Sequence, residues 1–214
     1  MVGRIRKRVC SLGPLKKLVY LISPNKITSK FYQDLNKVLS FKNVCFFQLR
    51  LKKKTNQQIF KIAKKIKKIT AKHKVKLIIN DNYVIAGKVS ADGCHMGQLD
   101  GSLKIARSKL KNKILGVTCH NSKSFAINAI KSKADYLTFG SFFKSKLKPK
   151  AKKANINILR WAKKNVRKPI VVIGGINNSN YKKLINAGAN YIALSSFIWD
   201  NPSLKPEFAI RKFK

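Results

Sequence analysis

Short apolar runs alternate with amphipathic, lysine-rich segments along the chain. The apolar runs predict β-strands at 18–23, 44–51, 76–80, 93–98, 113–118, 136–141, 169–175 and 191–196. The segments between them predict helices at 29–40, 55–73, 82–88, 102–111, 122–132, 153–166 and 179–187. Several strand runs are apolar throughout, which is typical of parallel strands covered on both faces. The alternation predicts an α/β fold, a single-domain (β/α)8 TIM barrel, with a doubly wound open sheet as the alternative.

No linker divides the 214 residues, so we expect one barrel domain at 17–214, preceded by a basic N-terminal extension at 1–16. The most loop-like interior stretch, KSKLKPKAKK at 144–153, follows the sixth strand. In a barrel it would lie on the catalytic face. No apolar run approaches the ~18–20 residues of a membrane span, and no signal-type segment follows the basic start. We therefore expect a cytoplasmic protein with no membrane partner.

Charge is strongly unbalanced, with 48 Lys and Arg against seven Asp and Glu and a formal net charge of +41. Such a charge is typical of nucleic-acid binders, because cationic side chains displace phosphate counterions. A genome rich in A and T would also produce it. The lysines are scattered over helical segments such as 61–74 and do not form one patch with interleaved aromatics. This favours genome composition as the origin of the charge, with no specific nucleic-acid partner. The positive surface should still attract anionic substrates.

The four cysteines show no C-x-x-C spacing, and most of them lie within or at the ends of apolar runs. They are Cys10, Cys45, Cys94 and Cys119. We expect reduced thiols, mostly buried, and neither a disulfide framework nor a zinc site.

A weak internal repeat opens three of the predicted strands, as ADG at 91–93, ADY at 134–136 and ANY at 189–191. A small residue followed by Asp or Asn is a common helix-to-strand turn. We therefore interpret Asp92 and Asp135 as structural residues.

Active sites of such barrels lie at the C-terminal ends of the strands, so the residues there are candidates for chemistry. The second strand carries Gln48, Arg50 and Lys52 in alternation, which places them on one side. An amide and two cations could hold a diphosphate, with Arg as a bidentate donor and Lys as a point charge. The alternative is a solvated strand end.

Two of the seven acidic residues follow neighbouring strands, Asp81 after Asn80 and Asp100 shortly after Gln98. One or two carboxylates, together with substrate oxygens and waters, are the usual ligands of Mg²⁺. Each aspartate could instead cap the following helix, because Asp is a good N-cap residue. Their occurrence on adjacent strands favours a Mg²⁺ site formed by Asp81 and Asp100.

The fifth strand ends in Thr118, Cys119 and His120. His120 could carry a proton, orient a substrate or simply pack, and packing is the favoured interpretation. Cys119 has no paired base nearby in sequence, so no nucleophile is assigned.

The last two strands end in small residues, Gly174 and Gly175 after the seventh and Ser195 and Ser196 after the eighth. Glycines let backbone N–H groups approach a phosphate, and a helix N-terminus adds favourable partial charge. The loops after strands seven and eight are a frequent phosphate site of these barrels.

Taken in order, the segments QLRLK, LIINDN, ADGCHMGQLD, LGVTCHN, ADYLTFGS and PIVVIGGIN followed by AGANYIALSS resemble the thiamine phosphate synthase family. That family belongs to a larger group that includes thiazole tautomerases, and the resemblance covers about residues 18–200. It implies a Mg²⁺-dependent transferase that joins hydroxymethylpyrimidine diphosphate to thiazole phosphate, releases pyrophosphate and forms thiamine phosphate. It also implies a dissociative mechanism, which depends on stabilising the leaving group and needs no protein nucleophile.

The resemblance implies a role for individual residues. The pyrimidine diphosphate would contact Gln48, Arg50, Lys52, Asn80, Thr118 and Lys148. The thiazole phosphate would contact Ser145, Gly174, Gly175, Ser195 and Ser196. Mg²⁺ would be held by Asp81 and Asp100, and the catalytic residues would be Thr118, Ser145 and Lys148.

The chain departs from the family pattern at several of these places. Thr118 replaces a usual Ser, Leu147 replaces a loop Thr that contacts the thiazole phosphate, and Leu51 replaces an acidic residue. Ser23 stands where an Asp is often found. A thiazole-tautomerase-like protein or a diverged paralogue of the same fold is therefore an alternative.

The tautomerase branch commonly lacks the two metal carboxylates, so Asp81 and Asp100 favour the synthase. A basic nucleic-acid-binding barrel is the alternative from another class, since fold alone does not fix function. The expected partners are phosphorylated small molecules, and a homo-oligomer is compatible with the sequence.

Overall fold

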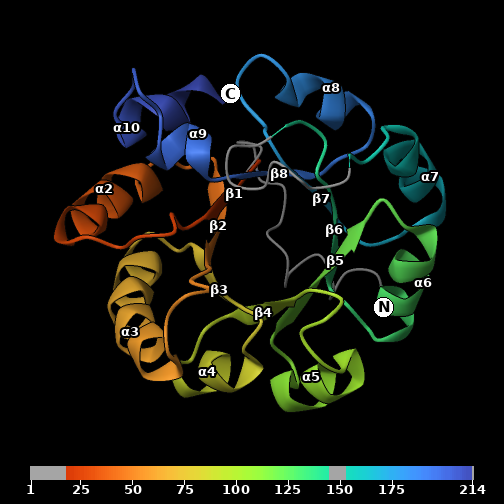
Figure 1. The fold of residues 1–214 in the computed structure, drawn as a ribbon, viewed down its shortest axis with the longest axis horizontal. Helices are drawn as coiled ribbons and strands as arrows, with labels where there is room; N and C mark the ends of the chain where they lie inside the picture. The colour runs from red at the N-terminus through yellow and green to blue at the C-terminus, as the bar shows by residue number, and fades with distance from the viewer. Residues whose placement is uncertain (1–17, 145–152, 214) are drawn as a thin grey trace.

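The structure, a computed structural model, describes residues 18–144 and 153–213. Its parallel strands are β1 (Val19–Ile22), β2 (Val44–Leu49), β3 (Lys76–Asn80), β4 (Gly93–Met96), β5 (Ile114–His120), β6 (Tyr136–Gly140), β7 (Ile170–Ile173) and β8 (Tyr191–Leu194). They pair in chain order and β8 pairs with β1, so the sheet closes into a barrel (Figure 1). The predicted (β/α)8 barrel is confirmed, and the open sheet is wrong because such a sheet has two edges. The predicted N-terminal extension 1–16 lies outside the described residues.

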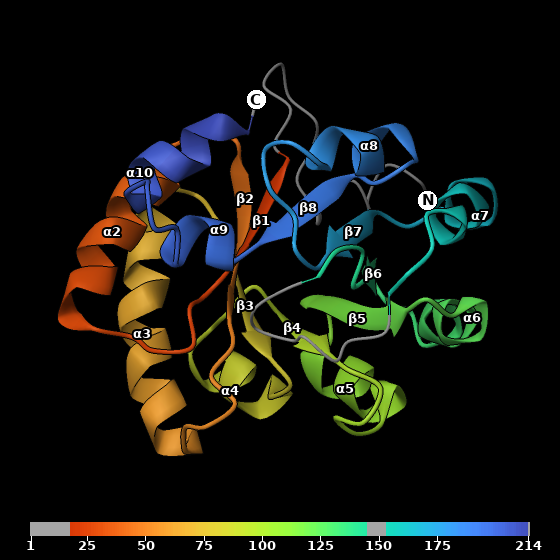
Figure 2. The same cartoon turned by 45° about the horizontal axis from the view of Figure 1, so that its top comes forward.

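Helices surround the barrel in the end-on view and in the tilted view (Figures 1 and 2). They are α2 (Ser29–Leu39), α3 (Asn56–Lys72), α4 (Tyr83–Lys88), α5 (Leu103–Leu110), α6 (Lys123–Lys131), α7 (Asn157–Asn165) and α8 (Tyr181–Asn186). Each helix from α2 to α6 begins after a polar residue whose side chain accepts a hydrogen bond from a backbone N–H of the first turn. Such caps satisfy N–H groups that have no partner inside the helix, and they fix where each strand-to-helix loop ends. None of the described helices has the length and apolar character needed to cross a membrane.

Two short helices that the sequence pattern did not predict follow β8, α9 (Ser196–Trp199) and α10 (Pro206–Ala209), with a 3₁₀ turn at Ile210–Lys212. Both lie on the α2 side of the barrel (Figures 1 and 2). The Trp199 indole donates a hydrogen bond to the backbone oxygen of Ile22 at 2.7 Å. The C-terminal helices thus attach to the end of β1, close to the barrel mouth.

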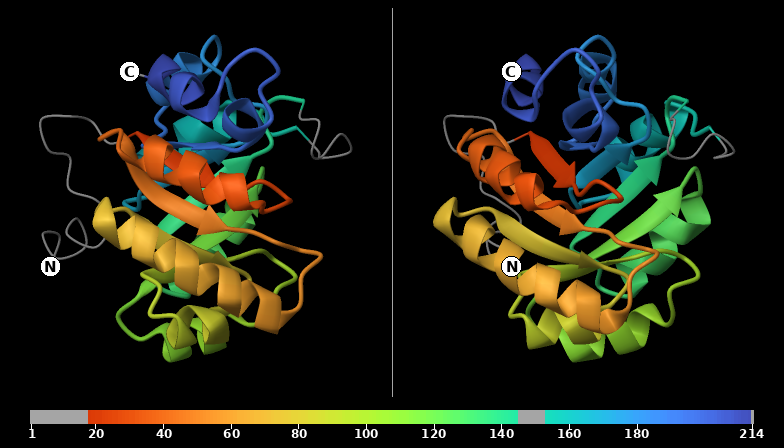
Figure 3. Two further views of the ribbon diagram at one scale, coloured as in Figure 1. Left: turned by 90° about the vertical axis from the view of Figure 1, so that its left-hand side faces the viewer. Right: turned by 60° about the vertical axis from the view of Figure 1, so that its left-hand side comes forward.

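The strands separate two apolar cores. The larger core lies between the outer face of the sheet and the helices, and the smaller fills the barrel interior. The interior core contains Tyr20, Ile22, Cys45, Phe46, Ile78, Ile114, Tyr136, Val171, Tyr191 and Ala193. Side views show the parallel strands running together toward one end of the barrel (Figure 3). Because side chains alternate along a strand, inward positions near that end fall on polar residues such as Gln48, Asn80 and Thr118.

The repeated Asp or Asn that precedes β4, β6 and β8 ties strands together at the opposite end of the barrel. Each side-chain oxygen accepts a hydrogen bond from a backbone N–H at the start of the preceding strand. The pairs are Asp92 with Leu77 (3.0 Å), Asp135 with Leu115 (2.9 Å) and Asn190 with Ile170 (2.8 Å). The structural interpretation of Asp92 and Asp135 is confirmed.

In the described part of the chain, Cys45, Cys94 and Cys119 are buried, reduced thiols, as expected. Burial raises the pKa of Cys94, and it raises that of Cys119 to about 12, so both remain protonated at neutral pH. Cys10 lies outside the described residues.

Candidate active site

The C-terminal ends of the strands open into a cavity of about 1050 Å³. Its lining includes the predicted site residues Gln48, Arg50, Lys52, Asn80, Asp81, Asp100, Thr118, Gly174, Gly175, Ser195 and Ser196. A cavity of this size can enclose two small ligands together. The structure therefore brings together the predicted residues that it describes, while Ser145, Lys148 and Leu147 lie outside the described residues.

The first group comes from β2 and the loop after it. Gln48 is 3% exposed, and its alternation with Arg50 and Lys52 places all three on the cavity wall. The Ser23 hydroxyl accepts a hydrogen bond from the Arg50 backbone N–H (3.0 Å) and contacts the Arg50 backbone oxygen (3.2 Å). Serine at this position thus ties the ends of β1 and β2 together. A solvated strand end is wrong for Gln48, because its side chain is buried.

Asp81 and Asp100 converge on one cation. The Lys52 ammonium forms an ion pair with the Asp81 carboxylate and lies 3.4 Å from Asp100 Oδ1. Asp100 also accepts a hydrogen bond from the backbone N–H of Gly97 at 2.7 Å. The two carboxylates therefore face each other across a single ammonium group at the rim of the cavity.

Neither aspartate caps a helix. Asn82 caps α4 by accepting from the Ile85 N–H at 2.8 Å, and Ser102 is the cap residue of α5. Asp81 has a positive φ of 63°, a left-handed conformation that Asn and Asp tolerate better than most residues. The helix-cap alternative is wrong for both residues.

The two carboxylates differ in their affinity for a proton. Burial and the neighbouring Asp100 raise the pKa of Asp81 to about 6, although Lys52 acts in the opposite direction. Burial also acts to raise the pKa of Asp100, but hydrogen bonds from the Asp81 side chain and the Gly97 N–H, together with Lys52, lower it overall. Burial acts to lower the pKa of Lys52, yet both carboxylates raise it. One ammonium therefore compensates two acidic groups incompletely.

This arrangement fits a Mg²⁺ site that the substrate completes. Among residues 18–144 and 153–213, no cluster of three or more His, Cys, Asp or Glu side chains could hold a metal ion. Mg²⁺ needs fewer protein ligands, because it retains waters and binds substrate phosphates beside one or two carboxylates. Asp81 and Asp100, on adjacent loops of one cavity, supply that number.

The loops after β7 and β8 form another part of the wall. Gly174 and Gly175 have positive φ values of 105° and 59°, and a Cβ on Gly174 would overlap Ser141 of the loop after β6. Glycine is therefore required for this close approach. Ser195 is the N-cap residue of α9, and its hydroxyl contacts the backbone oxygen of Ser23 at 3.3 Å.

His120 occupies a different environment from the packed one favoured by the sequence. Its side chain is exposed at the cavity rim, and its ring lies edge-on to Phe125 with centroids 6.3 Å apart. The packing interpretation is wrong because His120 ends β5 with a positive φ of 51°, where the chain leaves the sheet.

Leu51, which replaces an acidic residue of the family pattern, is 6% exposed and belongs to the outer core.

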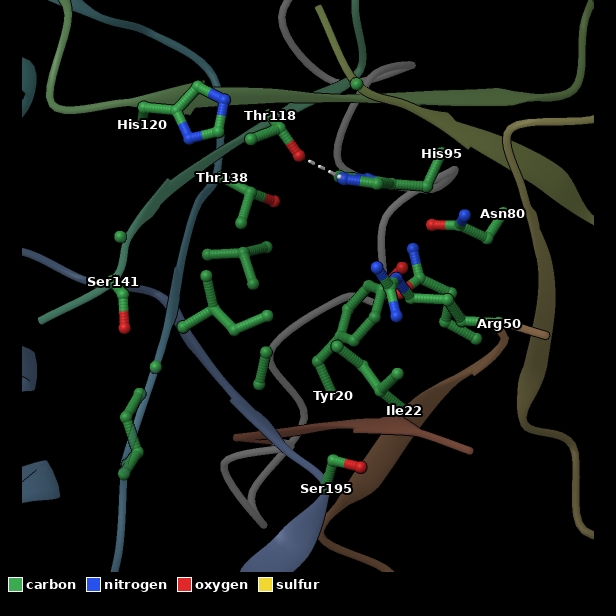
Figure 4. Close-up of a pocket in the computed structure, with 18 of the residues that line it drawn as sticks. Tyr20, Ile22, Arg50, Asn80, His95, Thr118, His120, Thr138, Ser141 and Ser195 are labelled. Atoms are coloured by element: carbon green, nitrogen blue, oxygen red, sulfur yellow. Dashed lines mark hydrogen bonds between the residues drawn. The ribbon is translucent and has the colours of Figure 1, made fainter. Parts of the chain in front are cut away.

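Sequence reasoning missed a histidine in the interior. His95 of β4 is 7% exposed and lies on the cavity wall, where its Nε2 contacts the Thr118 hydroxyl at 2.8 Å (Figure 4). Its Nδ1 lies 3.0 Å from the Tyr136 hydroxyl, which lies 2.7 Å from the Tyr20 hydroxyl. The apolar run GCHM around His95 gives no spacing signal for this network, because its members come from four different strands.

Comparison with known proteins gives one consistent result. A family model described as thiamine monophosphate synthase matches residues 19–198. A thiamine-phosphate synthase of Pelagibacter ubique is 56% identical, over 93% of this chain and 97% of that protein. Another from Nitrosospira multiformis is 33% identical, over 97% of this chain and 90% of that protein.

Solved structures agree. A thiamine phosphate pyrophosphorylase from Pyrococcus furiosus superposes with a TM-score of 0.82 at 25% identity, covering 92% of this chain and 93% of the other. A 3-hexulose-6-phosphate synthase from Salmonella typhimurium superposes with a TM-score of 0.67 at 16% identity, covering 91% and 96%. The second likeness reflects the barrel fold alone.

Proposed function

Because the chain belongs to the thiamine monophosphate synthase family, we propose that its barrel mouth joins a pyrimidine diphosphate to a thiazole phosphate and releases pyrophosphate. The activity, formation of thiamine phosphate, makes the protein a transferase. The identity of 56% to a curated synthase supports this activity over a tautomerase-like paralogue or a nucleic-acid-binding barrel.

The observation that carries the proposed geometry is the convergence of cations and carboxylates on one side of the cavity. Arg50 and Lys52 supply positive charge, and Lys52 already contacts Asp81 and Asp100. Gln48 and Asn80 line the same cavity as neutral hydrogen-bonding groups, and the close-up shows Arg50 near Asn80 (Figure 4). We assign the pyrimidine diphosphate to this side.

Asp81 and Asp100 would hold Mg²⁺ together with oxygens of the bound diphosphate. A bound Mg²⁺ would supply positive charge that stabilises the leaving pyrophosphate. Lys52 contacts both carboxylates and has two roles in this assignment, since it compensates part of their charge before the substrate binds and contacts the diphosphate afterwards.

The thiazole phosphate belongs on the opposite wall, at Gly174, Gly175, Ser195 and Ser196. Glycine N–H groups and serine hydroxyls suit a phosphate that must be held and not cleaved. The two substrates would then meet above the aromatic floor of the barrel, with their phosphates at separate ends.

Bond cleavage in this site depends on stabilising charge on the departing group. Arg50 and Lys52 lower the energy of the leaving pyrophosphate, and the Thr118 hydroxyl can donate a further hydrogen bond to it. The buried thiols have raised pKa values and take no part as nucleophiles. Positioning the thiazole nitrogen against the pyrimidine carbon then completes the transfer.

The experiment that tests this assignment compares Asp81→Asn and Asp100→Asn with Asp34→Asn, whose carboxyl lies on α2 outside the cavity lining. Purified proteins are incubated with both substrates over a Mg²⁺ titration, and thiamine phosphate is measured. We expect each site variant to lose about 100-fold or more in kcat, and the control to keep its activity. Full activity in both site variants would refute the metal assignment. Nucleic-acid binding that weakens steeply with salt, and that Asp81→Asn and Asp100→Asn leave unchanged, would instead support the basic-barrel alternative.

Ser145 and Lys148 stay predictions from the family resemblance. A cytoplasmic location stays a prediction from the sequence, and a homo-oligomer stays compatible with it. Alanine substitution of Lys148 in the same assay tests its proposed contact with the pyrimidine diphosphate.

A further inference from the structure

Hydrogen bonds link four polar side chains inside the barrel, and three of them, Tyr20, His95 and Thr118, also line the cavity. Tyr20 of β1 contacts Tyr136 of β6 (2.7 Å between hydroxyl oxygens), and Tyr136 contacts His95 Nδ1 of β4 (3.0 Å). His95 Nε2 then contacts the Thr118 hydroxyl of β5 (2.8 Å). Thr118 is the last of these four residues and lies beside His95 on the cavity wall in the close-up (Figure 4).

The direction of the hydrogen bonds follows from counting hydrogens. The Tyr20 hydroxyl is buried and needs an acceptor, and the acceptor in the structure is the Tyr136 oxygen. Tyr136 then has its own hydrogen to donate, and His95 Nδ1 is positioned to accept it. A histidine that accepts at Nδ1 carries its single hydrogen on Nε2 while it is neutral. That hydrogen points at the Thr118 oxygen.

We propose that Tyr20, Tyr136 and His95 are positioning residues that make the Thr118 hydroxyl accept from inside the barrel and donate its one hydrogen into the cavity. The acceptor in the cavity is the diphosphate of the pyrimidine substrate, so this inference rests on the assignment of Thr118 to that substrate. The opposite direction would turn the hydroxyl hydrogen inward, toward His95, and would present lone pairs to an anion.

The surroundings hold the His95 ring in place. The imidazole stacks on the Tyr136 ring, with centroids 5.7 Å apart and planes 17° apart. Gly116 of β5 leaves the space that Tyr136 fills, because a Cβ there would overlap the phenol. The network thus depends on a glycine that faces into the barrel.

This arrangement matters for catalysis because the leaving pyrophosphate gains negative charge as its bond breaks. A hydroxyl that is already oriented as a donor stabilises that charge more than one that must first reorient, because no reorganisation is needed at the transition state. Tyr20, Tyr136 and His95 would therefore affect kcat more than substrate binding.

The first test measures the tautomer directly. Nitrogen-15 NMR on His73→Gln/His120→Gln protein leaves His95 as the sole histidine of the chain. We expect a protonated Nε2 and a bare Nδ1 at pH 7. A protonated Nδ1 would overturn the proposal, whatever the activity of the enzyme.

The second test is a matched pair, Tyr136→Phe and Tyr20→Phe. Each removes one buried hydroxyl from the same cluster, but only Tyr136 donates to His95. We expect Tyr136→Phe to lower kcat about 10-fold with little change in KM and to shift the His95 tautomer. The size of this loss is that of one charge-assisted hydrogen bond, here the bond from the Thr118 hydroxyl to the diphosphate. Tyr20→Phe should have a clearly smaller effect on both. Equal losses in the two variants with an unshifted tautomer would mean that the hydroxyls act only through folding, and would overturn the proposal.

A third pair separates this inference from the assignment on which it rests. Thr118→Ser keeps the donor and should keep most of kcat, whereas Thr118→Val should lose about 10–100-fold. Full activity in Thr118→Val would refute the contact between Thr118 and the diphosphate. A loss in Thr118→Val together with a protonated Nδ1 would leave that contact standing and refute the positioning role of His95.

Discussion

Carboxylates at the two ends of this barrel have the same chemistry and opposite environments. At the N-terminal end of the strands, Asp92 and Asp135 accept backbone hydrogen bonds, and Asp92 pairs with Lys67 and Lys76 while Asp135 pairs with Arg107. At the open end, Asp81 and Asp100 share Lys52. Burial acts to raise the pKa of Asp92, but its ion pairs with Lys67 and Lys76 lower this pKa overall. The pKa of Asp81, by contrast, is raised by burial and by Asp100.

The difference separates residues that stabilise the barrel from residues that, in our proposal, bind a ligand. A carboxylate whose partners are all inside the protein contributes to folding. Two carboxylates that share one cation favour an additional positive charge, and such unfavourable arrangements occur at functional sites. In (β/α)8 barrels the N-terminal face serves stability and the C-terminal face serves chemistry, as this pair of environments illustrates.

The largest stability effect should come from Asp135→Asn. Its carboxylate lies 2.8 Å from Arg107, and the two side chains are only 7% and 14% exposed. Leaving a buried guanidinium unpaired should lower the free energy of unfolding by about 3 kcal/mol. Urea denaturation measures this loss, and an unchanged midpoint would remove the distinction between the two ends.

A smaller effect, dependent on pH, should follow Asp92→Asn. The pKa of Asp92 is lowered in the folded protein, so its contribution to stability is present above the unfolded pKa of about 3.9 and is lost as pH falls through the folded pKa. We expect the variant to be about 1–2 kcal/mol less stable at pH 7, with the difference shrinking below pH ~4. Denaturation curves at several pH values measure it. A difference that stays constant down to pH 3 would contradict the ion-pair origin.

The smallest change in stability should come from Asp81→Asn. Asparagine tolerates the left-handed backbone at this position, and removing one of two converging charges relieves repulsion. We expect the free energy of unfolding to stay the same or to rise by up to about 1 kcal/mol, while turnover falls. Thermal unfolding beside the activity assay tests it; a loss comparable to that of Asp135→Asn would show that Asp81 is a structural residue.

Sequence patterns predicted the barrel because parallel strands between covering helices are apolar throughout, and strand ends predicted the cavity wall. The same logic could not find His95, since one polar residue inside GCHM looks like a strand position of no special kind. The residues of its network lie on other strands, and the register between strands decides which of them meet. Tyr20 and Tyr136, for example, are 116 residues apart in sequence. The packing prediction for His120 was wrong for a different reason. A histidine at a strand end gives no sign in the sequence of whether the backbone there turns outward.

The helix-cap alternatives for Asp81 and Asp100 show a related limit. Asp81 and Asn82 are both good cap residues, and the choice between them depends on a backbone angle that sequence does not specify. The C-terminal helices α9 and α10 were also missed, because four-residue helices are too short to show periodicity.

The left-handed turn at Asp81 gives the experimenter a practical tool. Since asparagine fits that turn and leaves Arg50, Lys52 and the opposite wall in place, Asp81→Asn should fold normally and still admit both phosphorylated compounds. A crystal of that variant soaked with the two substrates would then capture them side by side before they react.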